Sequence, residues 1–113
     1  MHEISVLENL REIIEAQAQE QHFSNVARVT LAIGKLSCVD PEALRFGFAA
    51  VMKDTVAERA ELIIMEIPAL GFCGQCKGQT TMELLYDPCA YCGAPLTEIV
   101  QGRDLRIVDL LVS

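Results

Sequence analysis

Two pairs of cysteines, Cys73-Gly-Gln-Cys76 and Cys89-Ala-Tyr-Cys92, restrict the possible folds of this chain more than any other feature, and twelve residues separate them. Each pair can wrap one tight turn, and a hairpin of this length can bring the second turn back to face the first. Gly93 follows the second pair directly, where such a turn favours positive φ. Four thiolates are the ligand set of a structural tetrahedral zinc site with no open position. The spacing therefore predicts a metal brace and not a catalytic metal.

Three other assignments of the cysteine pairs compete with zinc: disulfides, a redox motif and an iron site. Disulfides need an oxidising compartment, whereas the start Met-His-Glu-Ile-Ser has neither a basic nor an apolar leader, so we expect a cytoplasmic protein. A thioredoxin-like redox motif would occur once, at a strand-to-helix junction. An iron–sulfur or rubredoxin-type iron site uses the same thiolates, and cysteine spacing alone does not separate it from zinc.

Composition limits the class of protein. A chain of 113 residues supports one ordinary domain, or a small one with a metal-stapled lobe. No apolar run approaches the roughly 20 residues of a membrane helix, so we expect no membrane partner. The net charge of −7, with only nine scattered lysines and arginines, argues against nucleic acid. No phosphate loop and no nucleophile–base set is present, so we expect no enzyme.

Hydrophobic periodicity predicts two helices. The first covers residues 3–21, where apolar side chains recur at helical spacing. The second begins with Asp40 as the N-cap and Pro41 at the first helical position, and runs to about Thr55. The side chains expected to be buried are Ile4, Leu7, Leu10, Ile13, Ile14 and Ala18 of the first helix, and Leu44, Phe48, Val51 and Met52 of the second.

Three strands are expected outside the cysteine segment, over residues 26–34, 61–67 and 105–112. The last strand needs partners, and the first two are the only substantial ones available. We therefore predict an α+β fold, in which two helices pack on a three-stranded sheet and a zinc-ribbon lobe is inserted. The predicted boundaries are 1–68 plus 103–113 for the α+β domain and 69–102 for the lobe.

The N-terminus is the second chemical clue. Histidine is too large for the usual removal of the initiator methionine, so Met1 should keep a free amine. This amine, the backbone nitrogens of His2 and Glu3 and the His2 imidazole can form fused chelate rings around Ni²⁺ or Cu²⁺, which favour planar nitrogen donors. The first amides of a helix have no intrahelical partner and are available for this purpose. The alternative is that His2 is an ordinary terminal residue.

Two further residues are weaker candidates. His22 lies at the polar end of the first predicted helix, where a solvent-exposed role is expected. Cys38 has no histidine nearby in sequence, so we expect it to be a small buried apolar residue and not a nucleophile.

Several segments together resemble the HypA/HybF family of hydrogenase nickel-incorporation proteins. They are the opening Met1-His2-Glu3-Ile4-Ser5, the run from Gly34 to Phe48, the two cysteine pairs, and Gly102-Arg103-Asp104-Leu105. The resemblance spans the whole chain in the same order. Its most specific part is the opening Met-His-Glu combined with cysteine pairs about seventy residues later.

The resemblance implies a cytosolic metallochaperone with two metals. Transferable Ni²⁺ would bind His2, with the Met1 amine and Glu3 assisting, and structural Zn²⁺ would bind Cys73, Cys76, Cys89 and Cys92. The implied partners are a GTPase of the HypB type and the large subunit of a [NiFe]-hydrogenase, or urease in some members. A homodimer is left open. If only the cysteine pairs are counted, the alternative is a zinc-ribbon adaptor that binds protein or nucleic acid and carries no transferable metal.

Overall fold

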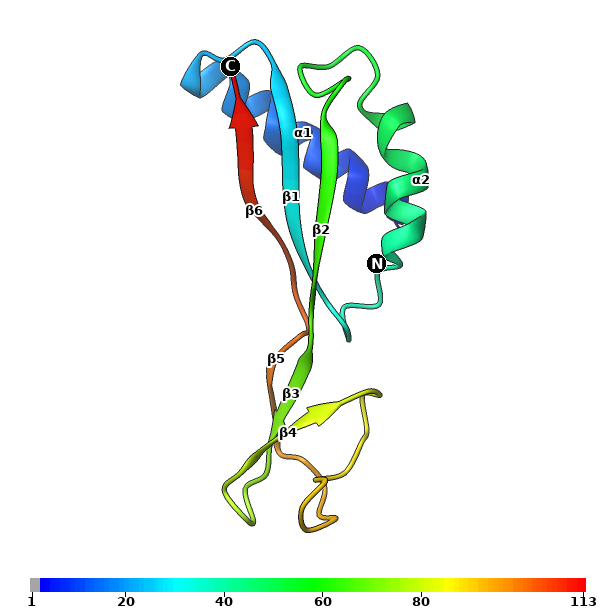
Figure 1. Ribbon diagram of the computed structural model, residues 1–113, viewed down its shortest axis with the longest axis vertical. Helices are drawn as coiled ribbons and strands as arrows, with labels where there is room; N and C mark the ends of the chain where they lie inside the picture. The colour runs from blue at the N-terminus through cyan, green and yellow to red at the C-terminus, as the bar shows by residue number, and fades with distance from the viewer. Residues whose placement is uncertain (1–2) are drawn as a thin grey trace. The chain divides into compact units, whose positions relative to one another are not determined.

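A computed structural model describes residues 3–113, which form two helices and six strands (Figure 1). Their order is α1 (Glu3–Gln21), β1 (Val26–Gly34), α2 (Pro41–Val51), β2 (Glu61–Ile67), β3 (Ala69–Phe72), β4 (Gln79–Met82), β5 (Glu98–Gln101) and β6 (Leu105–Val112). The strands make two three-stranded sheets, ordered β2-β1-β6 and β4-β3-β5.

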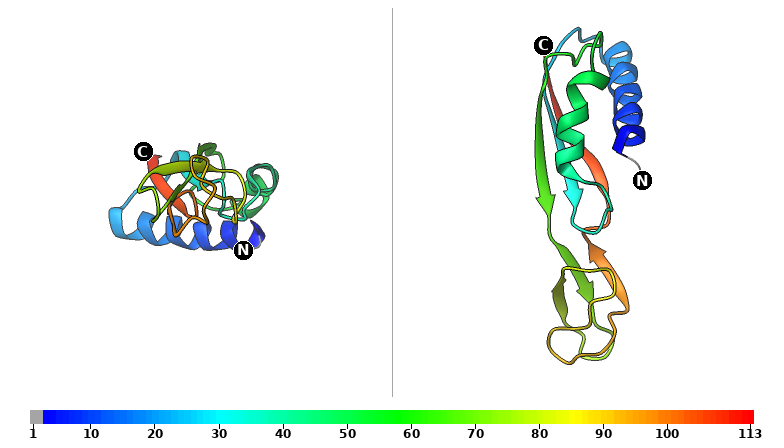
Figure 2. Two further views of the ribbon diagram at one scale, coloured as in Figure 1. Left: turned by 90° about the horizontal axis from the view of Figure 1, so that it is seen from below. Right: turned by 90° about the vertical axis from the view of Figure 1, so that its right-hand side faces the viewer.

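The first sheet confirms the predicted α+β fold. The C-terminal strand β6 lies beside β1, the first strand of the chain, and β2 lies on the other side. Both helices cover the same face of this sheet, as the right-hand view of Figure 2 shows. The central strand is almost fully covered, because every residue from Val29 to Gly34 is buried.

The helices fill the space above the sheet with apolar side chains. On α1 the buried residues are Val6, Leu7, Leu10, Ile14 and Ala18, and on α2 they are Leu44 and Phe48, followed by Met52. Each of these side chains except that of Ala18 contributes about 1.5–3 kcal/mol by leaving water.

Three of the predicted core residues are not buried. Ile4 and Ile13 are 43% and 40% exposed, and Val51 is only half-buried. On a helical projection Ile4 and Ile13 fall at the margins of the stripe formed by the buried residues of α1, where the helix surface curves away from the sheet. Val6, which the sequence pattern did not single out, lies within that stripe and is buried.

Helix α2 begins as predicted but ends earlier. The Asp40 side chain accepts a hydrogen bond from the Glu42 amide at 3.0 Å, and Pro41 stands at the first position of the helix. The helix ends at Val51 and not near Thr55. The Thr55 hydroxyl donates to the Met52 carbonyl at 2.7 Å, and Asp54 adopts φ 65°, a left-handed conformation that stops helical propagation.

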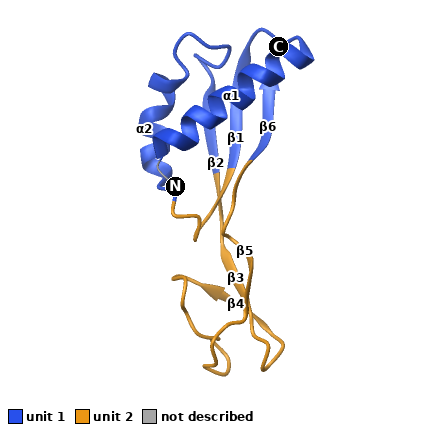
Figure 3. Ribbon diagram, turned by 180° about the vertical axis from the view of Figure 1, so that it is seen from behind, with its two compact units in different colours: residues 1–31, 39–64, 107–113 blue, residues 32–38, 65–106 orange. Residues whose placement is uncertain are grey.

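The chain divides into two compact units, coloured in Figure 3. One contains residues 1–31, 39–64 and 107–113, and the other contains residues 32–38 and 65–106. The predicted domain boundaries, 1–68 plus 103–113 and 69–102, remain a prediction.

The second unit contains three strands that the sequence did not predict. Strand β3 pairs antiparallel with β4, placing Ala69 opposite Met82, and antiparallel with β5, placing Leu70 opposite Gln101. The pairing with β5 changes register between Leu70 and Gly71. These strands support the turns that carry the cysteines.

Two glycines allow backbones to meet closely within the second unit. The Gly34 amide donates to the Asp104 carbonyl at 2.8 Å, and the Leu36 amide donates to the Gly102 carbonyl at 2.7 Å. A Cβ on Gly34 would collide with the Gly102 carbonyl. Gly102 itself has φ 97°, and a Cβ there would lie 2.5 Å from the Ala69 Cα. Space therefore excludes larger residues at both positions, and at Gly102 the backbone conformation disfavours them as well.

Replacing Gly102 by alanine should lower the free energy of unfolding by about 3 kcal/mol, because strain and overpacking add. Gly93→Ala is the matched control, since Gly93 has φ 75° but nothing within 4 Å of an added Cβ. It should cost only about 1–2 kcal/mol, the price of a left-handed alanine. Urea denaturation of both metal-loaded variants measures the difference. Equal destabilisation would contradict close packing at Gly102.

Candidate metal centres

The two cysteine turns have the same backbone hydrogen bonds. In the first turn, the Cys73 amide donates to the Gly78 carbonyl at 2.9 Å and the Lys77 amide donates back to the Cys73 carbonyl at 2.8 Å. In the second turn, the Cys89 amide donates to the Ala94 carbonyl at 2.8 Å and the Gly93 amide donates back to the Cys89 carbonyl at 2.9 Å. Each turn therefore folds back on its first cysteine in the same way.

The same position of each turn adopts the left-handed conformation. Gly93 has φ 75°, which confirms the prediction from sequence, and Lys77 at the equivalent place has φ 63°. The left-handed conformation costs a lysine about 1–2 kcal/mol because its Cβ crowds the following carbonyl, whereas glycine has no Cβ and avoids this cost. The hydrogen bonds that close the first turn hold Lys77 there.

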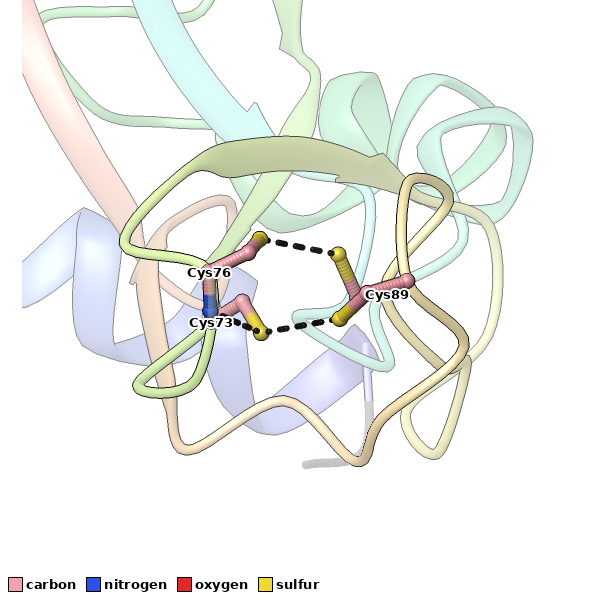
Figure 4. A group of neighbouring side chains, drawn as sticks. Cys73, Cys76 and Cys89 are labelled. Carbon is pink, nitrogen blue, oxygen red and sulfur yellow. Dashed lines mark hydrogen bonds between the residues drawn. The ribbon is translucent and has the colours of Figure 1, made fainter.

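The turns bring all four sulfurs together. The Sγ atoms of Cys73, Cys76, Cys89 and Cys92 lie within 4.8 Å of one another. The close pairs join one turn to the other, with Cys73 Sγ 3.5 Å from Cys92 Sγ and Cys76 Sγ 3.7 Å from Cys89 Sγ. In Figure 4 the labelled Cys73, Cys76 and Cys89 point toward a common centre. Sulfurs at the corners of a zinc tetrahedron, each about 2.3 Å from the ion, are about 3.8 Å apart, so the set fits zinc.

Backbone amides favour the thiolate form of the first cysteine in each turn. The Cys76 amide lies 3.5 Å from Cys73 Sγ, and amide donation from Cys76 and Gln75 lowers the pKa of Cys73 to about 6, although burial acts in the opposite direction. At Cys89, donation from the amides of Cys92 and Tyr91 lowers the pKa of the thiol. These two cysteines are buried.

The pKa of the second cysteine in each turn is raised instead of lowered. The Ala94 amide favours the thiolate of Cys92, but the neighbouring Cys73 sulfur, burial and Cys89 outweigh it and raise its pKa to about 11. The Gly78 amide acts similarly on Cys76, and the sulfurs of Cys73 and Cys89 raise its pKa. Hydrogen bonds between the sulfurs, together with burial, thus oppose full ionisation of the cluster. A divalent cation removes that opposition and deprotonates all four thiols.

The predicted nickel ligands are only partly described. Met1 and His2 lie outside the described residues. Glu3 begins α1, is half-buried, and accepts a hydrogen bond from the Asp40 amide to its Oε1 at 3.2 Å. Its carboxylate is therefore fixed at the N-terminal end of both helices.

The sequence predicts a single role for Asp40, as the N-cap of α2. Its amide also anchors Glu3, which is 37 positions earlier in the chain. Local patterns do not reveal this contact, because it depends on how α1 packs on α2. The one hint in the sequence is Gly47, a glycine inside α2 that lets α1 pack closely, since a Cβ there would lie 2.9 Å from Leu7 Cδ1.

Neither of the two weaker candidates belongs to the cysteine cluster. His22 is exposed directly after α1 and adopts φ 60°. Cys38 is exposed, so the expectation that it would be buried is wrong. Its backbone is left-handed, with φ 65°, and its Sγ makes a weak hydrogen-bond contact of 3.9 Å to the Leu36 carbonyl.

A family model described as "Hydrogenase/urease nickel incorporation, metallochaperone, hypA" matches residues 1–112. This chain belongs to the HypA family. The family resemblance predicted from the sequence is confirmed, and with it a place among nickel-incorporation metallochaperones for hydrogenase maturation.

Relatives and solved structures agree with this assignment. The chain is 42% identical to hydrogenase maturation factor HypA of Rhodopseudomonas palustris strain BisA53 and 40% identical to that of Acidithiobacillus ferrooxidans, in each case over 100% of both chains. It resembles the solution structure of the nickel metallochaperone HypA from Helicobacter pylori, with TM-score 0.71 and 26% identity, covering 99% of this chain and 97% of that one. Neither helix within residues 3–113 is long and apolar enough to cross a membrane.

Replacing Cys73 by alanine should abolish metal binding by the cluster, because three ligands from two turns cannot close the tetrahedron. We expect one zinc ion per wild-type chain and none in the variant, with amide exchange accelerated in β3, β4 and β5 and unchanged in α1. Cys38→Ala is the control and should keep its metal. Metal analysis and hydrogen exchange measure both effects. Full zinc content in Cys73→Ala, or iron in wild type, would exclude the zinc assignment.

Proposed function

We propose that this chain binds Ni²⁺ at its N-terminus and delivers it, in the cytoplasm, for maturation of a [NiFe]-hydrogenase. The proposed nickel ligands are the Met1 amine, His2 and Glu3, and the proposed structural zinc ligands are Cys73, Cys76, Cys89 and Cys92. The family match over residues 1–112 is the observation that carries the proposal. The partners are a HypB-type GTPase and the hydrogenase large subunit. The chain acts as a carrier and catalyses no reaction of its own.

The chemistry of the N-terminus suits a transferable metal. An α-amine, backbone nitrogens and an imidazole are nitrogen donors, which Ni²⁺ prefers to the oxygen donors that suit Mg²⁺ or Ca²⁺. Residue 2 is bonded directly to Glu3, whose carboxylate is held by the Asp40 amide. This contact gives the ligand segment a fixed base on α2, while the donors themselves come from the end of the chain.

The proposed zinc ion has a different task. Strands β3, β4 and β5 have only four residues each, and they enclose few large apolar side chains. A unit of this size has too little apolar surface to hold such short strands by burial alone. Metal binding supplies the missing folding free energy, and the closed set of four thiolates leaves no position from which the ion could be passed on.

His2→Ala should abolish nickel binding and leave zinc content and fold unchanged, because residue 2 precedes the helix and the core. His22→Ala is the matched control, since it removes the chain's other histidine and should bind nickel like wild type. Nickel titration of untagged proteins by calorimetry measures this, and hydrogenase activity in a complemented deletion strain gives the functional readout. Wild-type affinity in His2→Ala would place the nickel site elsewhere.

Adding Gly-Ser before Met1 should weaken nickel binding at least about tenfold, roughly 1.4 kcal/mol, although His2 is untouched. The extension turns the α-amine into an amide, which loses its proton far less readily and cannot anchor the chelate rings. Titrations should compare native-start and extended proteins that both carry their tag at the C-terminus. If their affinities are equal, the amine is not a ligand and the site depends on side chains.

A further inference from the structure

The two cysteine turns match in their backbones and differ in their side chains. Their equivalent hydrogen bonds align Cys73-Gly-Gln-Cys76 with Cys89-Ala-Tyr-Cys92. In this alignment Tyr91 takes the place that Gln75 has in the first turn. The cluster is therefore symmetric in its four sulfurs and asymmetric in the groups beside them.

Tyr91 reaches from the second turn to the first. A Cβ built on Gly78 would lie 3.8 Å from Tyr91 Cδ2 and 3.9 Å from Tyr91 Cε2, so one edge of the ring faces that glycine. The same Cβ would lie 3.7 Å from Cys76 Sγ. The ring edge and the Cys76 sulfur thus border the same small space, the one that a side chain on Gly78 would fill.

The backbone that carries this ring is held by the second turn. The Tyr91 amide donates to Cys89 Sγ at 3.4 Å, and the Gly93 amide closes the turn on the Cys89 carbonyl at 2.9 Å. The ring itself is 75% exposed, so it adds little burial to the lobe. Removing an exposed side chain away from a core changes stability little, so a variant without the ring should still fold.

The four sulfurs differ in how a reagent from solvent can reach them. Cys73 and Cys89 are buried, whereas Cys76 and Cys92 are exposed. An incoming ligand or thiol reagent therefore meets Cys76 or Cys92 first. The groups placed around metal ligands control how readily solvent enters such a site.

The ring lies on the approach to only one of these two sulfurs. At Cys76, Tyr91 narrows the space beside the sulfur. The residues in the equivalent places at Cys92 are Gln75 and Ala94, neither of which carries a ring. The two exposed sulfurs therefore differ in access although the turns that carry them have the same backbone.

We propose that Tyr91 determines access to the metal centre: its ring restricts attack at the Cys76 sulfur, so that competing ligands and thiol reagents enter at Cys92. The consequence for metal exchange rests on the proposed zinc site, whereas shielding of the sulfur requires no ion. Tyr91 supplies no metal ligand. The ring acts by its bulk, so its hydroxyl group is dispensable.

Alkylation of the purified protein by iodoacetamide tests the shielding, with the modified cysteine identified by mass spectrometry. In wild type we expect Cys92 to react about tenfold faster than Cys76, the lower end of the effects that groups around metal ligands have. Tyr91→Ala should raise the rate at Cys76 to that at Cys92 and leave Cys92 unchanged, and Tyr91→Phe should react like wild type. Tyr86→Ala is the matched control, because it removes an exposed ring of the same unit and should change neither rate.

Transfer of zinc to an excess of a chromogenic chelator is measured on the same proteins, together with zinc affinity by competition at equilibrium. Tyr91→Ala should release zinc about twice as fast as wild type, because it opens a second route equivalent to the one at Cys92. Its zinc affinity should be unchanged, since the four sulfurs are retained.

Three outcomes overturn the proposal. The first is an unchanged alkylation rate at Cys76 in Tyr91→Ala, and the second is an equal acceleration in Tyr86→Ala. The third is acceleration at Cys76 and Cys92 alike with loss of zinc affinity, which would show that Tyr91 stabilises the turn and does not shield a sulfur. Failure of the zinc site would appear separately, as wild-type protein isolated without zinc, and the alkylation rates would still decide whether the ring protects Cys76.

Discussion

Four sulfurs within 4.8 Å of one another form an arrangement in which two of the thiols resist ionisation unless a cation binds. Backbone amides favour the thiolates of Cys73 and Cys89, whereas burial and hydrogen bonds to the neighbouring sulfurs disfavour those of Cys76 and Cys92. The proposed zinc ion would reverse that balance and link two turns that are separated in sequence. The short strands β3, β4 and β5 would then have a fixed frame, although few apolar side chains lie between them. Under the proposed function, the second unit thus depends on metal coordination where an ordinary domain depends on a hydrophobic core.

The helical unit depends on burial instead, and Glu3, one of the proposed nickel ligands, lies where two helices begin. Leu7, Leu10 and Ile14 of α1 pack over a β1 strand whose Val29 and Leu31 are fully covered. This packing brings Glu3 to the Asp40 amide, so a carboxylate next to the terminal residues is held by a well-ordered helix start. Under the proposed function, rigid elements thereby hold Glu3, one of the proposed nickel ligands, at the start of a helix and outside the apolar core.

The sequence predicted the elements whose signals are local. An amphipathic repeat of five turns identified α1, strict alternation identified β1, and the Asp40-Pro41 start identified α2. The strands β3, β4 and β5 were missed because four residues are too few to show a period, and a metal rather than a hydrophobic pattern supports them. The four cysteines were found from spacing alone. The exposure of Cys38 was mispredicted, because composition cannot show that its backbone turns left-handed, and the Glu3–Asp40 contact depends on tertiary packing.

The uneven burial of the four cysteines means that the affinity of the proposed zinc site and the rate at which it loses its ion need not go together. Cys73 and Cys89 are covered, whereas Cys76 and Cys92, one from each turn, face solvent. The ion would be held tightly at equilibrium by four thiolates, yet two of its bonds are open to attack by small chelators and oxidants. Occupancy would then be thermodynamically secure and kinetically labile. The lifetime of the folded lobe would follow the thiol redox state of its surroundings as well as the supply of zinc.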